Sequence, residues 1–167
     1  IEVRDATHID LTLKQGLQWS GGFGEVTAED VAYSYDRMLE SEWKGAYAAY
    51  DHTEVKDRYS GTIVLNQPFA PFMSATLASG TGIINCKKAL EGAGGKYTIE
   101  APASCGPYVI LEHKQGQHLK LRANPDWNGP QPAFSNIDCI FVTEDQAGAL
   151  AFEAGELECA KITSNSY

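Results

Sequence analysis

Short segments of alternating apolar and polar residues, which are typical of half-buried strands, recur along the chain. This alternation, or a short apolar run, marks His8–Leu13, Gly61–Leu65, Ile83–Ile84, Tyr108–Leu111, Leu119–Ala123, Ile137–Val142 and Leu157–Ile162. A turn at Gln115-Gly-Gln117 joins two of these segments into a predicted hairpin, which ends at Asn124-Pro125 because the residue before a proline avoids helical space. We expect this hairpin, which follows Ser104-Cys-Gly-Pro107, to be a rigid frame for the rest of the chain.

A helix is predicted to begin at residue 27. Thr27-Ala-Glu-Asp30 has the spacing of a capping box, in which the Thr27 hydroxyl and the Asp30 carboxylate bind the backbone N–H groups of the first turn. Val31, Tyr35 and Met38 then follow at helical spacing and form one apolar stripe. The helix is therefore expected to run to about Glu40.

The remaining elements complete a mixed α/β pattern. Short helices are expected after Pro71, which suits a first helical turn, and over Cys86–Glu91, whereas the polar stretch 42–60 predicts a long loop. Glu144–Ala154 has a helical apolar face and lies between the last two predicted strands. These three elements predict a C-terminal βαβ unit with parallel strands and a right-handed crossover. The expected fold class is thus α/β with a mixed sheet, a hairpin and this βαβ unit.

Aromatic side chains gather in and just beyond the first helix. They are Tyr33, Tyr35, Trp43, Tyr47 and Tyr50. Such a group is able to form a wall on which a ligand stacks, or simply to fill the core and cover its edge. Packing in the core and on the surface is the favoured interpretation.

Composition and charge exclude several classes of partner. The chain has 167 residues, of which 43% are hydrophobic and 21% charged, as in a soluble globular domain with a sizeable core. Its net charge of −9 disfavours nucleic acid, whose phosphates would be repelled. No apolar run approaches the length that spans a bilayer, so we expect no membrane-spanning segment.

Four cysteines are too few for a disulfide scaffold and lack the CxxC spacing of a zinc site. They allow three pairings, between which the sequence does not choose, and buried free thiols are an equally simple interpretation. A metal site formed by His113 and His118 across the hairpin is conceivable, but two exposed histidines explain the same pattern. We therefore assign no metal and no cofactor.

A cysteine-dependent hydrolase is the alternative catalytic interpretation. Cys105 would be the nucleophile and one of the four histidines its base, namely His8, His52, His113 or His118. The residues around Cys105 carry no local signature of such an enzyme, because Pro107-Tyr108 leads directly into a strand. Acidic residues gather at helix starts, where capping accounts for them. The sequence therefore favours a protein that is not an enzyme.

Six segments together resemble the extracellular solute-binding proteins of family 5, the peptide, opine and nickel class that supplies ABC importers. The segments occur in the family's order and are Ile9-Asp-Leu-Thr-Leu-Lys-Gln-Gly-Leu-Gln-Trp-Ser20, Thr27-Ala-Glu-Asp-Val-Ala-Tyr-Ser34, Gly61-Thr-Ile-Val-Leu-Asn-Gln-Pro-Phe-Ala-Pro-Phe72, Ser104-Cys-Gly-Pro-Tyr-Val-Ile110, Leu121-Arg-Ala-Asn-Pro-Asp-Trp127 and Ala151-Phe-Glu-Ala-Gly-Glu-Leu-Glu158. The chain departs from the family at Gly21-Gly22, where Asp-Gly is usual, and at Ser104-Cys105, where Gly-Thr is usual.

The resemblance implies a periplasmic substrate-binding component that delivers a small solute, most simply a peptide, to a membrane permease. Family members are two-lobed clamps about three times as long as this chain, which matches part of the first lobe only. Residues 1–167 are thus expected to be a partial first lobe, with the second lobe absent and an exposed apolar face where the rest of the protein packs. The sequence does not choose between peptide, opine, sugar and metal as the ligand.

The resemblance also implies a ligand site in two loops at strand ends. The residues in them are Ser79, Gly80, Thr81, Gly82, Ser104, Cys105 and Gly106. Small side chains there would let backbone N–H groups approach a ligand directly. In the oxidising periplasm a disulfide between Cys86 and Cys105 is then expected to link two cleft-side loops, and Cys139 with Cys159 is a second conceivable pair.

Overall fold

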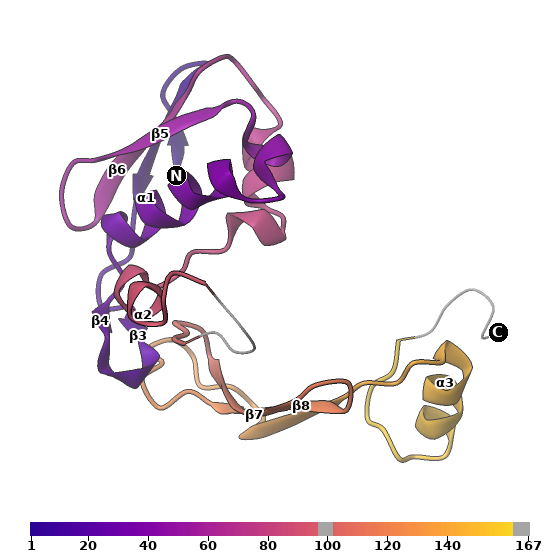
Figure 1. The fold of residues 1–167 in the computed structure, drawn as a ribbon. Coiled ribbons are helices and arrows are strands. Elements are labelled where there is room, and N and C mark those ends of the chain that lie inside the picture. The colour runs from indigo at the N-terminus through magenta and orange to yellow at the C-terminus, as the bar shows by residue number, and fades with distance from the viewer. Residues whose placement is uncertain (97–101, 162–167) are drawn as a thin grey trace. The chain divides into compact units, whose positions relative to one another are not determined.

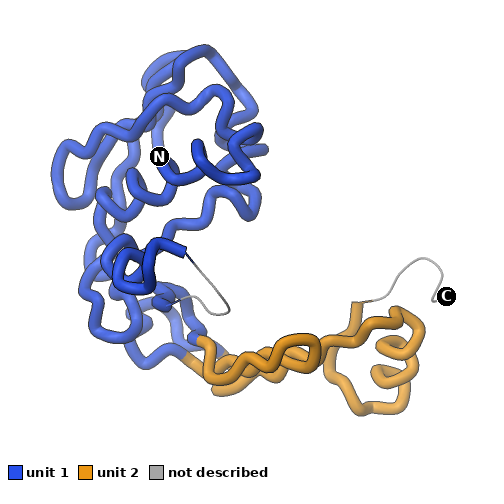
Figure 2. The backbone as a smooth tube through the Cα atoms, viewed as in Figure 1, with its two compact units in different colours: residues 1–109, 124–132 blue, residues 110–123, 133–167 orange. Residues whose placement is uncertain are grey.

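The computed structural model describes residues 1–96 and 102–161, which form two compact units. Unit 1 comprises residues 1–109 and 124–132, and unit 2 comprises residues 110–123 and 133–167 (Figure 2). The mixed α/β class predicted from the sequence is confirmed, with helices and several sheets in the chain (Figure 1). Within the described ranges, no helix is long and apolar enough to cross a membrane.

Unit 1 is built on a four-stranded sheet with the order β1-β2-β6-β5. Its strands are β1 (Glu2–Val3), β2 (His8–Thr12), β6 (Ser60–Leu65) and β5 (Tyr50–Val55), and each neighbouring pair is antiparallel. The predicted strands at His8–Leu13 and Gly61–Leu65 are thus confirmed. Helix α1 lies against β5 (Figure 1).

The prediction that 42–60 is a long loop is wrong. This stretch contains a 3₁₀ turn at Lys44–Tyr47 and strand β5. Only Tyr50 and Thr53 of the strand are buried, and its other side chains are polar or exposed. The register shifts between Tyr50 and His52, so the spacing of the buried residues is three rather than two. A bulged edge strand therefore hides the alternation that identifies strands in a sequence.

Helix α1 (Ala28–Asp36) begins with the predicted capping box between Thr27 and Asp30. The regular helix ends at Asp36, and residues Arg37–Glu40 continue as a 3₁₀ turn, so the expected end at Glu40 is reached in a tighter geometry. The apolar stripe packs inward, with Val31 and Tyr35 buried.

Aromatic side chains fill the core between α1 and the sheet. Tyr35, Tyr47, Tyr50 and Phe72 have ring centroids 5.5–6.4 Å apart, mostly edge to face. Burial raises the pKa of Tyr35 to about 12, because the phenolate loses hydration there. Packing, rather than a ligand wall, accounts for these three tyrosines.

The rest of unit 1 is formed by short elements. The strands β3 (Gln18–Trp19) and β4 (Gly24–Glu25) pair across a turn in which Gly21 and Gly22 have positive φ. A π-helical turn spans Phe72–Leu77, with Pro71 as its N-cap, and helix α2 spans Lys87–Gly92. The predicted strand at Ile83–Ile84 is wrong: these residues are extended but unpaired, and Ile83 is 61% exposed.

Unit 2 contains the sheet β7-β8-β9 and helix α3 (Asp145–Glu153). The predicted hairpin is confirmed as β7 (Tyr108–Lys114) and β8 (His118–Ala123), with Gly116 at φ 72° in the turn. Strand β9 (Asn136–Ile140) pairs antiparallel with β8. Gly155 follows α3 with φ 75°, as expected for a C-terminal glycine.

The C-terminal βαβ unit is not formed by the described residues. Residues 157–161 contain no strand, and Ile162 lies outside the described ranges. The strand pairs β1–β2, β2–β6, β5–β6 and β8–β9 are all antiparallel, so none of them is the parallel pair that the expected mixed sheet requires. Alternating residues need a partner strand, and 157–161 has none within the described chain.

Candidate functional site

The first predicted ligand segment is a tight turn that ends the Phe72–Leu77 helix. Ser79 caps the 3₁₀ turn Gly80–Gly82, accepting a hydrogen bond from the Thr81 backbone N–H at 3.3 Å. The Ser79 and Thr81 hydroxyls both donate to the Thr76 carbonyl, at 2.8 and 3.0 Å. Gly82 has no space for a side chain, because an added Cβ would lie 2.0 Å from the Leu77 carbonyl oxygen. The turn therefore has one defined shape.

Tyr47 holds this turn from inside the core. Its hydroxyl donates to the Thr81 carbonyl oxygen at 2.8 Å, although the two residues lie 34 positions apart, and the ring is fully buried. Burial raises the Tyr47 pKa, so the hydroxyl stays protonated and able to donate. Thr76 donates in addition to the Ala46 carbonyl at 3.0 Å. Gly80 remains exposed, with open space where a Cβ would lie.

The second predicted ligand segment is held by Ser20 and Asn124. The Ser104 backbone accepts from Ser20 N at 2.8 Å and donates to Ser20 Oγ at 3.0 Å. The Asn124 side chain donates to the Gly106 carbonyl at 2.8 Å, and its backbone N–H donates to Pro107 O. Asn124 is 2% exposed, so these bonds are shielded from water. The segment 104–107 is thus a positioned loop in which residues 104–106 are half-buried and Pro107 is exposed.

Asp30 connects the surroundings of the two segments. Its buried carboxylate accepts from the Trp19 indole N–H at 3.2 Å, from Thr27 N at 2.9 Å and from Lys87 N at 2.9 Å. The carboxylate therefore caps α1 and also joins β3 to the first residue of α2. The sequence predicted only the capping bond, because its other partners are distant in the chain.

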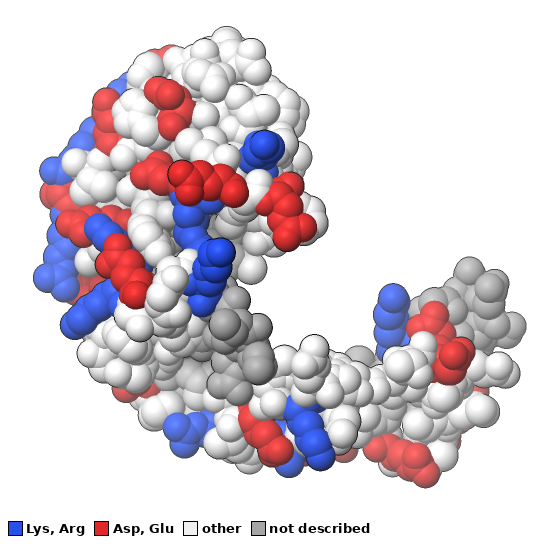
Figure 3. All heavy atoms as spheres, viewed as in Figure 1, with Lys and Arg blue, Asp and Glu red and all other residues white. Residues whose placement is uncertain are grey.

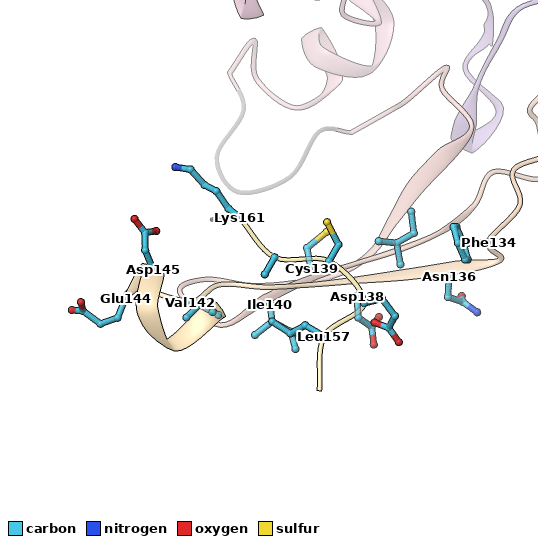
Figure 4. A pocket seen from close by; sticks show the side chains of 15 residues that line it. Phe134, Asn136, Asp138, Cys139, Ile140, Val142, Glu144, Asp145, Leu157 and Lys161 are labelled. Atoms are coloured by element: carbon cyan, nitrogen blue, oxygen red, sulfur yellow. The ribbon is translucent and has the colours of Figure 1, made fainter. Parts of the chain in front are cut away.

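Two hollows lined by described residues lie away from these loops. One of about 770 Å³ in unit 1 lies beside the start of α1 and mixes Arg58, Lys87 and Lys88 with Glu25, Glu29, Asp57 and Glu91. Another of about 740 Å³ lies in unit 2, where Ile140, Val142 and Leu157 border it (Figure 4). Neither hollow is lined by the seven predicted ligand residues. The structure thus shows two positioned loops, each with its own set of partners.

Acidic and basic side chains are mixed on the surface of unit 1. Figure 3 shows acidic and basic side chains next to one another on the visible face of this unit. Asp10 is the centre of one such group: its carboxylate pairs with Arg4 and with Lys56 at 3.0 Å, and it accepts from Thr62 at 2.6 Å. These hydrogen bonds hold the Asp10 pKa well below its usual range.

The arrangement of the histidines does not support a cysteine hydrolase. Three of the four histidines have a ring nitrogen beside a carboxylate oxygen: His8 at 2.9 Å from Asp5, His52 at 2.9 Å from Asp51, and His118 at 3.2 Å from Glu112. The ring of the fourth, His113, packs edge-on against Phe141. Burial raises the pKa of the Cys105 thiol, whereas a nucleophilic cysteine needs a lowered pKa. Among residues 1–96 and 102–161, no group of three or more His, Cys, Asp or Glu is placed to hold a metal ion.

Solved structures define the class of protein to which this fold belongs. The substrate-binding protein MoaA of A. tumefacien R10, in complex with mannopinic acid, is 31% identical and superposes with a TM-score of 0.82 over 95% of this chain and 32% of its own. NikZ from Campylobacter jejuni, in complex with Ni(L-His), has the same fold with a TM-score of 0.83 at 18% identity, over 99% of this chain and 34% of its own. The fold is that of part of a substrate-binding protein.

The family follows from the sequence comparison. The family model for bacterial extracellular solute-binding proteins, family 5 (Middle), matches residues 2–167, and the chain belongs to this family. The probable D,D-dipeptide-binding periplasmic protein DdpA of Escherichia coli is 29% identical over 89% of this chain and 30% of its own length. The oligopeptide-binding protein AppA of Bacillus subtilis is 24% identical over 95% of this chain and 30% of its own. The chain therefore spans about three tenths of the length of these curated relatives.

Proposed function

We propose that this chain is part of a periplasmic substrate-binding protein that captures a peptide-like solute and delivers it to the permease of an ABC importer. The observation that carries the proposal is the family match over residues 2–167. Relatives named for a D,D-dipeptide and for oligopeptides support the peptide class. The protein acts in the periplasm and binds its ligand without converting it.

The proposed ligand site consists of the two loops at Ser79–Gly82 and Ser104–Gly106. Both are fixed by buried partners, Tyr47 for the first and Asn124 for the second, so neither loop needs to be ordered when a ligand arrives. The side chains of Ser79 and Thr81 are occupied within their own turn. The contribution of this loop to binding is therefore backbone groups near the exposed Gly80.

We further propose that the chain is a partial first lobe. Unit 2 leaves large apolar side chains exposed, which are Ile110, Leu111, Phe134, Ile140, Phe141, Val142, Leu150 and Phe152. Soluble proteins rarely leave so many together without a partner. The part of a full-length protein beyond this chain is the natural cover, since the chain spans about three tenths of its relatives.

A thermal-shift screen of the full-length protein tests the proposal. The probes are dipeptides, including D-Ala-D-Ala, longer peptides, mannopinic acid, sugars and nickel. We expect peptides to raise the melting temperature by several degrees at millimolar concentration, because a ligand that binds only the folded state stabilises it. Stabilisation by sugars or nickel alone would refute the peptide assignment.

The site residues are tested by a matched pair of glycine variants. Gly80 and Gly92 both have ordinary backbone angles and open space at the Cβ position, so neither substitution strains the fold. We expect Gly80→Leu to weaken binding of the peptide found in the screen at least tenfold, because the side chain blocks backbone approach, and Gly92→Leu to leave it unchanged. Equal affinities of the two variants would remove this loop from the site.

An opine is the second candidate ligand. The structure of MoaA, 31% identical to this chain, was determined with mannopinic acid. In the same screen, a shift with mannopinic acid and none with any peptide would favour this alternative while leaving the transport role intact.

A further inference from the structure

Two cysteines of unit 1 meet in one apolar cluster. Cys86 is 3% exposed and packs with the buried side chains of Trp19, Val26, Ala89 and Ala103, and Cys105 packs against the same cluster. Burial, and to a smaller degree the charge of a Cys86 thiolate, raises the pKa of the Cys105 thiol. Residues 19 positions apart in the sequence are thus brought to one place.

The backbone around each cysteine is linked by hydrogen bonds to the region where strand β3 ends and the 3₁₀ turn Ser20–Gly22 begins. Ser104, the neighbour of Cys105, exchanges two hydrogen bonds with Ser20, at 2.8 and 3.0 Å. Lys87, the neighbour of Cys86, donates to the Asp30 carboxylate, which in turn accepts from the indole of Trp19. Trp19 and Ser20 are adjacent in the chain, so the residues next to both cysteines are linked to one point of it, directly for Ser104 and through Asp30 for Lys87.

We propose that Cys86 and Cys105 form a disulfide in the mature protein. Two S–H bonds break and one S–S bond forms, and the two protons and two electrons pass by thiol–disulfide exchange to another disulfide, which is reduced to two thiols. The structure contains the reduced form, in which both are thiols. The proposal depends on the oxidising periplasm but not on the identity of the ligand.

The chemistry of the pair indicates when the bond forms. Burial raises the pKa of both thiols, and the thiolate is the reactive species. Exchange is therefore slow once the cluster has closed, and the bond is expected to form while the chain folds. Once formed, it is shielded from reductants, and it joins the N-terminal end of α2 to the Ser104–Gly106 loop of the proposed ligand site.

The other two cysteines provide an internal comparison. Cys139 and Cys159 lie in unit 2, where both line the hollow of Figure 4, and Cys159 is exposed. The experiment therefore has to identify which sulfurs are joined, rather than only count thiols. Peptide mapping does this directly.

The test is disulfide mapping of the full-length protein, purified from the periplasm without reductant and alkylated in denaturant before digestion. We expect one linked peptide pair that contains Cys86 and Cys105 and disappears after reduction. The same pair should persist in the double variant Cys139→Ser/Cys159→Ser. Alkylated Cys86 and Cys105 in the unreduced protein, or either of them joined to Cys139 or Cys159, would overturn the proposal.

A stability measurement provides the second readout. Closing a loop of about 20 residues restricts the unfolded chain, so wild-type protein that is reduced in denaturant and refolded with reductant is expected to melt roughly 5–10 °C below the oxidised protein. The double variant Cys86→Ser/Cys105→Ser should show no shift on reduction. An unchanged melting temperature of the reduced wild type would contradict the link. Because mapping uses the wild type, poor folding of a variant does not affect the main result.

Discussion

The sheet of unit 1 is covered by α1 and by closely packed aromatic rings, whereas unit 2 leaves apolar side chains exposed on β7, at and just after the end of β9, and on α3. Among the described residues, every buried large hydrophobic side chain belongs to unit 1. In α3 only Gly148 is buried, while Leu150 and Phe152 are 59% and 49% exposed. Unit 1 thus has a core of its own, and we propose that unit 2 provides one side of a core that the rest of a full-length protein completes.

The largest expected effect is the loss of a core ring in unit 1. Phe72 is fully buried against Tyr47 and Tyr50, so Phe72→Ala should lower the free energy of unfolding by about 3–5 kcal/mol, measured by denaturant titration. Phe152→Ala in unit 2 removes the same ring from an exposed position and should cost at most about 0.5 kcal/mol in the 167-residue chain. Equal costs would break the comparison between the units.

The same Phe152→Ala substitution sharpens the comparison in the full-length protein. If the remainder of that protein covers unit 2, the substitution should lower the free energy of unfolding by more than about 2 kcal/mol, because the ring is then buried. A cost that stays below about 0.5 kcal/mol would show that this face remains exposed.

The next effect concerns the buried carboxylate that connects α1, β3 and α2. Asp30→Ala leaves the N–H groups of Trp19, Thr27 and Lys87 without their acceptor and should cost about 2–4 kcal/mol in denaturant titration. The neighbouring Glu29 is 67% exposed, so Glu29→Ala is the control and should cost at most about 0.5 kcal/mol. Similar costs would indicate that Asp30 only caps the helix.

A smaller effect is expected from the hydroxyl that holds the first ligand loop. Tyr47→Phe keeps the ring and removes only the bond to the Thr81 carbonyl, so the cost should be about 1 kcal/mol. Amide hydrogen exchange over residues 79–82 should accelerate while exchange in β6 stays unchanged. Unaltered exchange at the loop would show that its own hydroxyl bonds suffice to hold it.

The smallest effect is the pH dependence of the turn before β2. Asp5 accepts from the backbone N–H of Thr7 and lies beside His8, which together lower its pKa to about 2. The folded pKa is below the unfolded value of about 3.9, so this stabilisation is present above pH 4 and is lost as the pH falls through 2. Carbon-detected NMR should find the carboxyl midpoint near 2, and Asp5→Asn should remove the dependence. A midpoint near 4 would contradict the hydrogen bonding.

Local spacing predicted the elements that local interactions determine. The capping box from Thr27 to Asp30 and the hairpin around Gly116 depend on neighbouring residues, and both are present. The bulged strand β5 was missed because its one-sided burial and polar side chains imitate a loop. The strand predicted at Leu157–Ile162 is absent over its described part, 157–161, because alternation does not reveal whether a partner strand is available.

The site was predictable only in part for the same reason. The small residues of the two loops stand out in the sequence, and the family resemblance predicts a ligand role for them, which stays a prediction. Their supports are Tyr47, Ser20 and Asn124, which act across 34, 84 and 18 positions respectively. No local pattern contains such contacts, because packing of the whole unit creates them.

The central claim is that this chain holds one side of a ligand clamp and needs the rest of the protein to bind. Isothermal titration of one peptide, selected by the thermal-shift screen, into the full-length protein and into the 167-residue chain tests it directly. The account predicts saturable binding to the full-length protein and none to the chain at the same concentration. Sub-micromolar binding by the chain alone would contradict it.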